Sequence, residues 1–415
     1  MDLTVESPEA VGCSAQRLAR IAPVMQSYVD QHGFAGISTM LARRGRVVHF
    51  EQVGWQDRES HIPLSTDTIF RIYSMTKPII CVALMTLYEE GRFQLLDPVD
   101  KFLPAFGKLR VQMGATLADS QAADLIRPIT IRDLLTHISG LTYNFLEDSP
   151  VSELYRQAGL LSDANRTLEA MIGELARLPL AYQPGTKWHY SMAIDVLAHL
   201  VEVISGQLLQ HFLNERLFAP LGMTDTGFSI ASDKRARIAT MYGLPDIATN
   251  SFSGIFEAWT SGFNQRIDVE TTYPANNTSS FARGGHGLFS TAGDYMRFAQ
   301  MLLNRGELNG ARIIAPKIAD LMHMNHVPLG LLPYEIGGEP SGGYGFGLGS
   351  RVLLNVAESG LPGSVGEFGW GGAAKTYYWV DPQEELIGVL MTQYMVGFDI
   401  PEKDFQVLAY QALLD

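Results

Sequence analysis

Segments with strand character gather at the two ends of this 415-residue chain, and that layout limits the folds that it can adopt. Such segments are rich in β-branched and aromatic residues, and turn residues separate them. They cover 36–42, 47–55 and 68–73 near the N-terminus, and 344–354, 374–380 and 386–393 near the C-terminus. Helical spacing of apolar residues marks 14–31 and 402–414. The pattern predicts an α+β fold, an antiparallel sheet built from both ends of the chain and flanked by terminal helices.

A long region of different texture separates the two groups of strands. Helical segments cover 131–135, 168–178 and 192–205, and irregular stretches with few strand signals join them. A chain of this length also exceeds what one hydrophobic core usually holds. We therefore expect two domains: a discontinuous sheet domain of residues 1–91 plus 281–415, and an inserted, mostly helical domain of residues 92–280 whose loops cover a cleft.

The charge balance and the apolar pattern exclude several classes of protein. The formal net charge is −13 and no basic run is interleaved with aromatic residues, so no nucleic-acid partner is expected. The chain opens without a basic or continuous apolar segment, and no apolar run reaches membrane-spanning length. Only Cys13 and Cys81 are present, and Cys81 falls in an apolar run typical of a core. We expect a cytoplasmic protein without a membrane partner; its oligomeric state stays open.

The sequence Ser74-Met75-Thr76-Lys77 is the first candidate for chemistry. It lies where an extended run gives way to a helical pattern that continues to Gly91. At a helix N-terminus a serine hydroxyl lies near unpaired N–H groups, and a lysine three residues later shares its face. A lysine held in its neutral form by burial and nearby cations can take the serine proton. Taken alone, the pattern equally describes an N-capping serine with a surface lysine.

A second candidate is Tyr190, which lies between the turn at 183–186 and a helical run that ends at Ser205. A tyrosine beside a lysine ammonium shares its proton more readily than usual, which suits a relay between nucleophile and leaving group. A tyrosine with only a packing role fits the same residues.

The glycine-dense stretch Gly369-Trp370-Gly371-Gly372-Ala373 enters a predicted strand. Glycines let a backbone approach a ligand closely. A strand edge beside the nucleophile would offer one N–H to the oxyanion of a tetrahedral intermediate, with the N–H of the nucleophilic serine as the other donor. A β-bulge explains the same glycines.

Several stretches, in the same order along the chain, resemble the serine β-lactamase-related family. They are Phe70-Arg71-Ile72-Tyr73-Ser74-Met75-Thr76-Lys77, Ile131-Arg132-Asp133-Leu134-Leu135-Thr136-His137-Ile138-Ser139-Gly140-Leu141, Tyr190-Ser191-Met192, Gly284-Gly285-His286-Gly287-Leu288-Phe289-Ser290-Thr291-Ala292-Gly293-Asp294 and Trp370-Gly371-Gly372. The likeness runs from near residue 7 to the C-terminus, and within the family the chain is most similar to the family VIII esterases.

The resemblance implies a β-lactamase/transpeptidase-like fold and acyl transfer without a metal or cofactor. It implies that Ser74 is the nucleophile, that Lys77 and Tyr190 handle its proton, and that the N–H of Ala373 is the second oxyanion donor. Trp370, Gly371 and Gly372 would line the substrate site.

The chain departs from the class C β-lactamases at two positions. Met192 stands where their tyrosine motif has asparagine, and Trp370 begins the motif that starts with lysine in those enzymes. A methionine cannot hydrogen-bond an amide, and an aromatic surface replaces the cation that meets a substrate carboxylate, so neutral esters are expected to fit better. Lys375 follows closely, and we expect it to point away from the substrate.

Other residues carry weaker signals. Tyr143 and Asn144, in the loop after Gly140-Leu141, are candidates to line the cleft. Asp195 reads as a capping or solvated residue of the helix after Tyr190. The spacing of His323 and His326 favours a surface helix over a metal site. No Gly-x-Ser-x-Gly elbow is present, which argues against an ordinary α/β-hydrolase.

The segment 244–277 is the candidate cover of the cleft, although a plain packing role fits it as well. It carries Phe252, Ile255, Phe256, Trp259 and Phe263 among small polar residues. The resulting hypothesis is a serine carboxylesterase that cleaves small esters of short to medium acyl chain. The alternatives are an acyltransferase of the lovastatin type, a β-lactamase or D-amino-acid peptidase, and, last, a non-catalytic penicillin-binding sensor.

Overall fold

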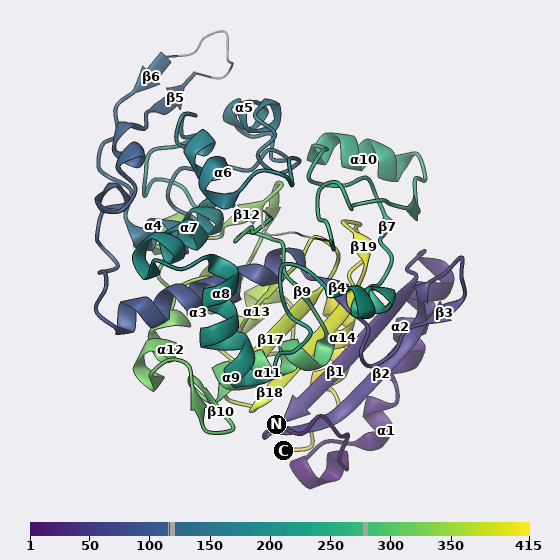
Figure 1. Cartoon of the computed structure of the whole chain (residues 1–415). Coiled ribbons are helices and arrows are strands. Elements are labelled where there is room, and N and C mark those ends of the chain that lie inside the picture. Colours follow the sequence, from purple (N-terminus) through teal and green to yellow (C-terminus); the bar gives the residue numbers. More distant parts are fainter. Residues whose placement is uncertain (115, 117–120, 277–280) are drawn as a thin grey trace.

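A computed structural model describes residues 1–114, 116, 121–276 and 281–415 (Figure 1). Its centre is an eight-stranded antiparallel sheet in the order β14-β15-β16-β17-β18-β1-β2-β3. The N-terminal strands are β1 (Gly36–Arg43), β2 (Arg46–Asp57) and β3 (Ile62–Pro63); the C-terminal strands are β14 (Tyr344–Phe346), β15 (Arg351–Leu353), β16 (Phe368–Gly371), β17 (Tyr377–Asp381) and β18 (Leu386–Thr392). Because β1 pairs with β18 in the middle, both ends of the chain build one sheet, which confirms the predicted α+β architecture.

Helices cover both faces of this sheet. The helices α2 (Ile21–Gln31) and α14 (Pro401–Tyr410) pack on one face, around Trp379 and Phe405. On the other face α11 (Ala292–Leu303) packs on β1, β17 and β18. Successive side chains of β1 point to opposite faces of the sheet. Leu41 therefore packs in the core under α2 and α14, and Met40 packs in the core under α11. All of β1 is therefore buried, as expected for a central strand that is covered on both sides.

The helical region lies at one end of the sheet and packs on α3 (Thr76–Glu89), the helix that follows the S-x-x-K serine. Almost every residue of α3 is buried, because the helix lies between α7 and the sheet domain. A capping box of Thr130 and Asp133 starts α4. The helices of this region are α4 (Ile131–Leu135), α5 (Val151–Gln157), α6 (Leu168–Leu175), α7 (Ala193–Ser205), α8 (Leu209–Leu213), α9 (Ala219–Leu221) and α10 (Phe252–Thr260).

The remaining elements are short. The helices are α12 (Pro316–Met322) and α13 (Val356–Ser359), and the strands are β5 (Val111–Met113), β6 (Gln121–Ala123), β7 (Tyr242–Gly243), β8 (Gln265–Arg266), β10 (Glu307–Leu308), β11 (Ala311–Arg312), β12 (Glu335–Ile336), β13 (Glu339–Pro340) and β19 (Tyr394–Met395). The strand β7 pairs with β8 and with β19, so the region before 280 also contacts the C-terminal part of the chain. The domain boundaries at 91/92 and 280/281 stay predictions; residues 115, 117–120 and 277–280 of the expected insert lie outside the described residues.

Three expected elements differ from the structure. Residues 14–31 form α1 (Ala15–Leu18) and α2, because the ring of Pro23 would clash with the carbonyl of Ala19, four residues earlier, in a continuous helix. The run 68–73 shortens to β4 (Phe70–Arg71), which pairs with β9 (Phe289–Ser290) and not with the main sheet. The run 344–354 is the hairpin of β14 and β15, which turns at Gly349 with φ +102°.

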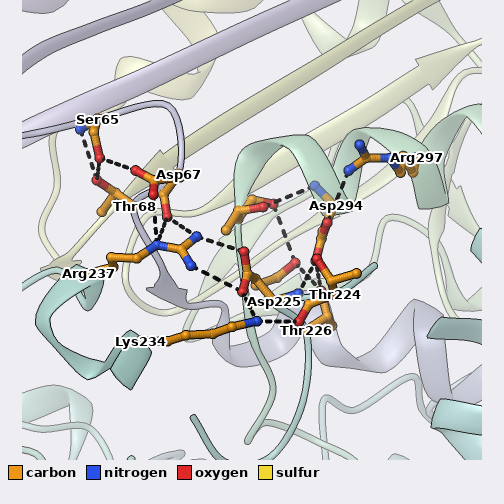
Figure 2. A network of polar contacts seen from close by, with 12 residues as sticks. Ser65, Asp67, Thr68, Thr224, Asp225, Thr226, Lys234, Arg237, Asp294 and Arg297 are labelled. Carbon is orange, nitrogen blue, oxygen red and sulfur yellow. Dashed lines mark hydrogen bonds and ion pairs between the residues drawn. The ribbon is translucent and has the colours of Figure 1, made fainter. Parts of the chain in front are cut away.

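A polar network ties residues 224–237 to the turn at 65–68 and to the first turn of α11 (Figure 2). Arg237 forms ion pairs with Asp225 (2.7 Å) and Asp67 (2.9 Å). Lys234 pairs with the same Asp225 carboxylate at 2.7 Å. The buried Asp294 accepts the N–H of Asp225 at 2.8 Å. These contacts join the expected insert to the sheet domain.

The described residues contain no single helix with the length and apolar composition needed to cross a bilayer; Ala193–Ser205 and Leu209–Leu221 have them only as a pair, bent by 83°. No group of three or more His, Cys, Asp or Glu side chains in the described ranges is arranged to hold a metal ion.

His323 and His326 were expected on a surface helix, but they lie just beyond α12 and are half-buried. The His323 ring stacks on Phe368, with 3.5 Å between the ring centroids, which withdraws it from solvent.

Candidate active site

The candidate nucleophile Ser74 lies in a short 3-10 turn, Tyr73–Met75, that leads into α3. Its side chain is partly exposed, in a segment whose neighbours are buried. The preceding Tyr73 has φ +43°, a conformation that is unfavourable for a bulky residue. Strain of this kind persists where surrounding contacts enforce it and is concentrated at functional sites. The turn presents the hydroxyl of Ser74 at the entrance of the helix.

Lys77 lies one helical turn further on, with 1% of its surface exposed. Its ammonium donates to Ser74 Oγ at 2.9 Å and to the carbonyl of Gly285 at 2.6 Å. The Gly285 carbonyl comes from the loop before β9, so two distant segments hold the amine against the serine.

Tyr190 completes the group, because its hydroxyl donates to Ser74 Oγ at 2.7 Å. Its ring is enclosed by three other rings, His137, Tyr143 and Trp370, with centroid distances of 5.0, 5.1 and 5.7 Å. Burial, together with the charge of Lys77, holds the pKa of His137 well below its usual range, so this imidazole is a neutral packing partner. The structure thus brings together all three residues predicted to be catalytic; their roles remain a proposal.

The hydroxyl of Ser74 opens into a cavity of about 390 Å³. Most of its wall is apolar or aromatic. The lining residues are Tyr73, Ser74, Tyr143, Phe145, Leu161, Tyr190, Ile247, Ala248, Phe252, Gly285, His286, Tyr334, Ile336, Ser341, Arg351, Trp370, Gly371, Gly372, Ala373, Lys375, Thr376, Tyr377, Val396, Gly397 and Glu402.

Trp370, Gly371, Gly372 and Ala373 of the glycine-rich stretch line this cavity; their role in binding substrate stays a prediction. A Cβ at Gly372 would come within 2.3 Å of Thr376 Oγ1 and 2.5 Å of the carbonyl oxygen of Ile72, so only glycine fits there. The N–H of Ala373 has no acceptor among the described residues, whereas its carbonyl accepts the N–H of Val396 at 2.7 Å. A free N–H beside the nucleophile is what an oxyanion donor requires.

The two candidates from the loop after Leu141 have different outcomes. Tyr143 lines the cavity, and its ring lies 5.3 Å from Lys77 Nζ. Asn144 was expected to line the cleft as well, but this is wrong. Successive side chains of the loop point to opposite sides, so Asn144 is buried away from the cavity and its amide donates to the carbonyl of Ala248 at 3.0 Å.

Lys375, expected to point away from the substrate, instead belongs to the cavity wall. Its ammonium lies 3.4 Å from the carboxylate of Glu402, which also lines the cavity. The second cation of the wall, Arg351, lies 3.4 Å from Glu367 and donates to the hydroxyl of Tyr377. Each cation therefore has an acidic partner, which leaves no uncompensated charge at this end of the cavity.

Two functional positions were missed or misread in the sequence. His286 lines the cavity, and burial lowers its pKa to about 3, with Arg283 and Lys77 acting in the same direction. Asp195 was expected to cap a helix or face solvent, but it is fully buried and accepts the N–H of Gly285 at 2.9 Å. The signal for His286 was the glycine-rich motif at 284–294, which contains it and to which no role had been assigned; the burial of Asp195 had no such signal.

The segment 244–277 reaches the cavity only in part, and Asn277 lies outside the described residues. Ile247, Ala248 and Phe252 line the cavity. Ile255 is buried in the core, and Phe263 packs against that core. Both expectations therefore hold for different residues: the start of the segment covers the site, and other side chains pack.

Comparisons with known proteins show the family and the fold of the chain. The Beta-lactamase family model matches residues 21–412. Protein Rv1367c of Mycobacterium tuberculosis is 35% identical over 365 residues, which cover 87% of this chain and 86% of the relative. Esterase EstB of Burkholderia gladioli is 30% identical over 392 residues, which cover 93% of each protein.

Among solved structures, EstCE1 is described as a hydrolase with promiscuous acyltransferase activity. It matches with a TM-score of 0.77 and 28% identity, over 96% of this chain and 99% of that chain. This match confirms the predicted β-lactamase/transpeptidase-like fold and the resemblance to family VIII esterases. On the family match and on its identity to EstB, the chain belongs to the β-lactamase family.

Proposed function

We propose that the protein is a serine carboxylesterase that cleaves small carboxylic esters through an acyl intermediate on Ser74. The observation that carries the proposal is the contact of Ser74 Oγ with both Tyr190 OH, at 2.7 Å, and Lys77 Nζ, at 2.9 Å. Membership of the family, with an esterase among the relatives, supports an enzyme of the esterase or acyltransferase kind.

In the first half-reaction Ser74 Oγ attacks the ester carbonyl and forms a tetrahedral intermediate. The serine proton passes to Lys77 when its amine is unprotonated, or to Tyr190 when its phenol is ionised; both groups lie within hydrogen-bonding distance of Ser74 Oγ. The N–H groups of Ser74 and Ala373 stabilise the oxyanion. When the C–O bond to the alcohol breaks, the same pair returns the proton to the departing alkoxide, and an acyl-Ser74 ester remains.

In the second half-reaction water attacks the acyl-enzyme. Tyr190 and Lys77 take a proton from the water and return it to Ser74 Oγ as the acyl–serine bond breaks, which releases the carboxylic acid and restores the enzyme. Every proton moves within one cluster of three side chains, so the reaction needs no histidine.

The cavity favours neutral esters over β-lactams. Met192, at the position of the lactamase asparagine, is fully buried and is not part of the cavity wall. Trp370 lines the wall where a lysine would meet a substrate carboxylate. Because Lys375 and Arg351 both have acidic partners, no free cation replaces it among the described residues.

The size of the cavity supports the finer part of the proposal, a short to medium acyl chain. About 390 Å³ is near the lower end of the range for small-molecule sites, of roughly 300–1,000 Å³. Phe145, Phe252 and Ile336 provide an apolar surface for an acyl chain or an aromatic alcohol.

An acyltransferase is the second candidate, because EstCE1 is described as having promiscuous acyltransferase activity. The same acyl-Ser74 would then react with an alcohol in place of water. An apolar cavity retains an alcohol more readily than water, which gives this candidate a physical basis.

The test is hydrolysis of p-nitrophenyl acetate and butyrate by the wild type, by Ser74→Ala and by Ser232→Ala, with the lactam nitrocefin in parallel. Ser232 is exposed, so its variant controls for the loss of a serine. We expect rapid ester turnover that disappears only in Ser74→Ala, and little nitrocefin cleavage. An inactive wild type, or activity that survives in Ser74→Ala, would contradict the proposal. Transfer to added methanol that outruns hydrolysis would favour the acyltransferase.

A further inference from the structure

A fully buried carboxylate, Asp195, lies behind the three proposed catalytic side chains. It belongs to the first turn of α7, five residues after Tyr190. Its Oδ1 accepts the N–H of Gly285 at 2.9 Å, and its Oδ2 has no hydrogen-bonding partner among the described residues. A buried, half-satisfied carboxylate is costly to maintain, which points to a function beyond packing.

Gly285 connects this carboxylate to the amine of Lys77. Its N–H binds Asp195, and its carbonyl accepts from Lys77 Nζ at 2.6 Å. A Cβ at this position would lie 2.5 Å from Asp195 Oδ2 and 2.6 Å from the hydroxyl of Tyr143. The position therefore requires glycine, and any movement of Asp195 would shift the carbonyl that holds the amine.

Charge couples the same groups. Burial raises the pKa of Asp195, while the N–H of Gly285 and the charges of Lys77 and Arg283 act against that rise. The titratable or charged groups around Lys77 come from five parts of the chain: Cys81 on its own helix, His137 and Tyr143 in the loop after α4, Tyr190 before α7, Asp195 on α7, and Arg283 and His286 before β9. Asp195 is the one carboxylate of this set.

We propose that Asp195 is a positioning residue for the reaction assigned above: it fixes Gly285, whose carbonyl holds Lys77 against Ser74, and its negative charge sets the pH at which Lys77 and Tyr190 exchange a proton with the serine. The inference rests on the proposed function, because it acts through the same three side chains.

The sign of the charge effect is the same for either base. Loss of a proton from the Lys77 ammonium or from the Tyr190 hydroxyl makes the site more negative, and a neighbouring carboxylate opposes that change. Removing the charge of Asp195 therefore favours the deprotonated base at lower pH. The base so obtained is also weaker, so each turnover at high pH is slower.

Asp195→Asn tests the inference, since it keeps the shape and an acceptor for the N–H of Gly285 but removes the charge. We expect the acidic limb of the kcat/KM profile for p-nitrophenyl acetate to move down by about one pH unit. We also expect kcat on the plateau to fall by about 3- to 10-fold with KM little changed. Asp195→Ala, which loses the acceptor too, should lower kcat by a further factor of about 10.

Asp294→Asn is the matched control. Asp294 is also a buried carboxylate that accepts a backbone N–H and neighbours an arginine, but it lies in the network of Figure 2 and outside the cavity wall. We expect this variant to lower the free energy of unfolding and to leave the pH profile unchanged. If Asp195→Asn behaves in the same way, with lost stability and a wild-type pH profile, Asp195 is only structural and the inference is wrong.

Labelling by a fluorophosphonate separates failure of the inference from failure of the proposed function. The rate of labelling reports the activation of Ser74 without any ester turnover. A wild type that resists labelling would overturn the proposed function. A wild type that is labelled, with an unchanged pH dependence in Asp195→Asn, would overturn the inference alone. Should Asp195→Asn not fold, Asp195→Ser provides a neutral acceptor of smaller size for the same measurement.

Discussion

The floor and the rim of the cavity are built in opposite ways. The floor consists of Ser74, Lys77, Tyr190 and Gly285, joined by hydrogen bonds of 2.6–2.9 Å. Outside the cavity wall, the exposed rings of Phe256, Trp259 and Phe398 form a cluster that we call the rim, since Phe256 follows the lining residue Phe252 by one helical turn and Phe398 directly follows the lining residue Gly397. The ring centroids of Trp259 and Phe398 lie 4.5 Å apart, and the three residues are 44–50% exposed.

The floor and the rim therefore differ in how strongly their side chains depend on one another. Each floor group is held by segments far apart in sequence, so a change to one group disturbs the others. The rim rings contact one another and are exposed, and their neighbours in sequence, Phe252 and Gly397, line the cavity. We therefore expect the floor to set kcat and the rim to set the preference between substrates.

Removing one hydroxyl from the floor should have the largest effect. Tyr190→Phe keeps the ring among His137, Tyr143 and Trp370 but loses the contact of 2.7 Å to Ser74 Oγ. We expect kcat for p-nitrophenyl acetate to fall by about 10²- to 10⁴-fold with KM little changed. Steady-state kinetics of both parameters provide the measurement.

Tyr143→Phe is the matched comparison, because Tyr143 also lines the cavity but its hydroxyl forms no hydrogen bond with Ser74 Oγ, whose partners are Lys77 and Tyr190. Its effect on kcat should be at least tenfold smaller than that of Tyr190→Phe. Equal losses in the two variants would mean that proton transfer is not localised at Tyr190, and the contrast within the floor would fail.

Truncating the rim should have an effect of intermediate size and of a different kind. Trp259→Ala removes a half-exposed ring, so we expect KM for p-nitrophenyl octanoate to rise by about 3- to 10-fold, as the loss of about 1 kcal/mol of apolar contact implies. The KM for the acetate ester and both kcat values should stay unchanged.

Ile126→Ala controls for the loss of an exposed apolar side chain outside the cavity wall. It should leave kcat and KM for both the acetate and the octanoate ester at their wild-type values. An equal loss for acetate and octanoate in Trp259→Ala would show that the rim supports the fold and does not sort substrates.

An effect on stability, and not on catalysis, is expected at acid pH. The pKa of His286 is lowered from 6.5 to about 3 by burial, so the folded protein binds fewer protons there than the unfolded chain. The contribution of His286 to the free energy of unfolding is complete above pH 6.5. It is lost as the pH falls toward 3, by at most about 1.4 kcal/mol per pH unit. His286→Asn should reduce this slope by about one proton, measured by urea unfolding between pH 7 and about 4.5.

Phe256→Leu, in the rim, changes no titratable group, and its slope should match that of the wild type. A wild-type slope in His286→Asn would mean that this imidazole is charged in the folded protein. The contrast between a cavity wall that is sensitive to pH and a rim that carries no charge would then be wrong.

Ser74, Lys77 and Tyr190 of the floor were identified from the sequence through the resemblance to a family, because each local motif taken alone also fits a capping or packing role. Ser74 and Lys77 share one helical turn, and a turn followed by a helix marks Tyr190. The sheet was predictable, since β-branched and aromatic runs mark its strands wherever they occur in the chain.

The features that could not be predicted depend on contacts between segments that lie far apart in the sequence. The burial of Asp195 follows from the loop at 284–288 packing on α7, and nothing around Asp195 in the sequence announces that loop. The burial of Asn144 and the cavity position of Lys375 are set by backbone direction within loops, which periodicity does not describe. Phe398 joins the rim from the far end of the chain, so no local pattern groups it with Trp259.

The most direct test of the account is the identity of the residue that becomes acylated. The wild type would be quenched in acid within the first turnovers of p-nitrophenyl butyrate, digested, and mapped by mass spectrometry, with Ser74→Ala treated in parallel. The account predicts one butyryl group, on the peptide that contains Ser74, and none in the variant. Butyrylation of another residue during turnover, or turnover by Ser74→Ala, would contradict it.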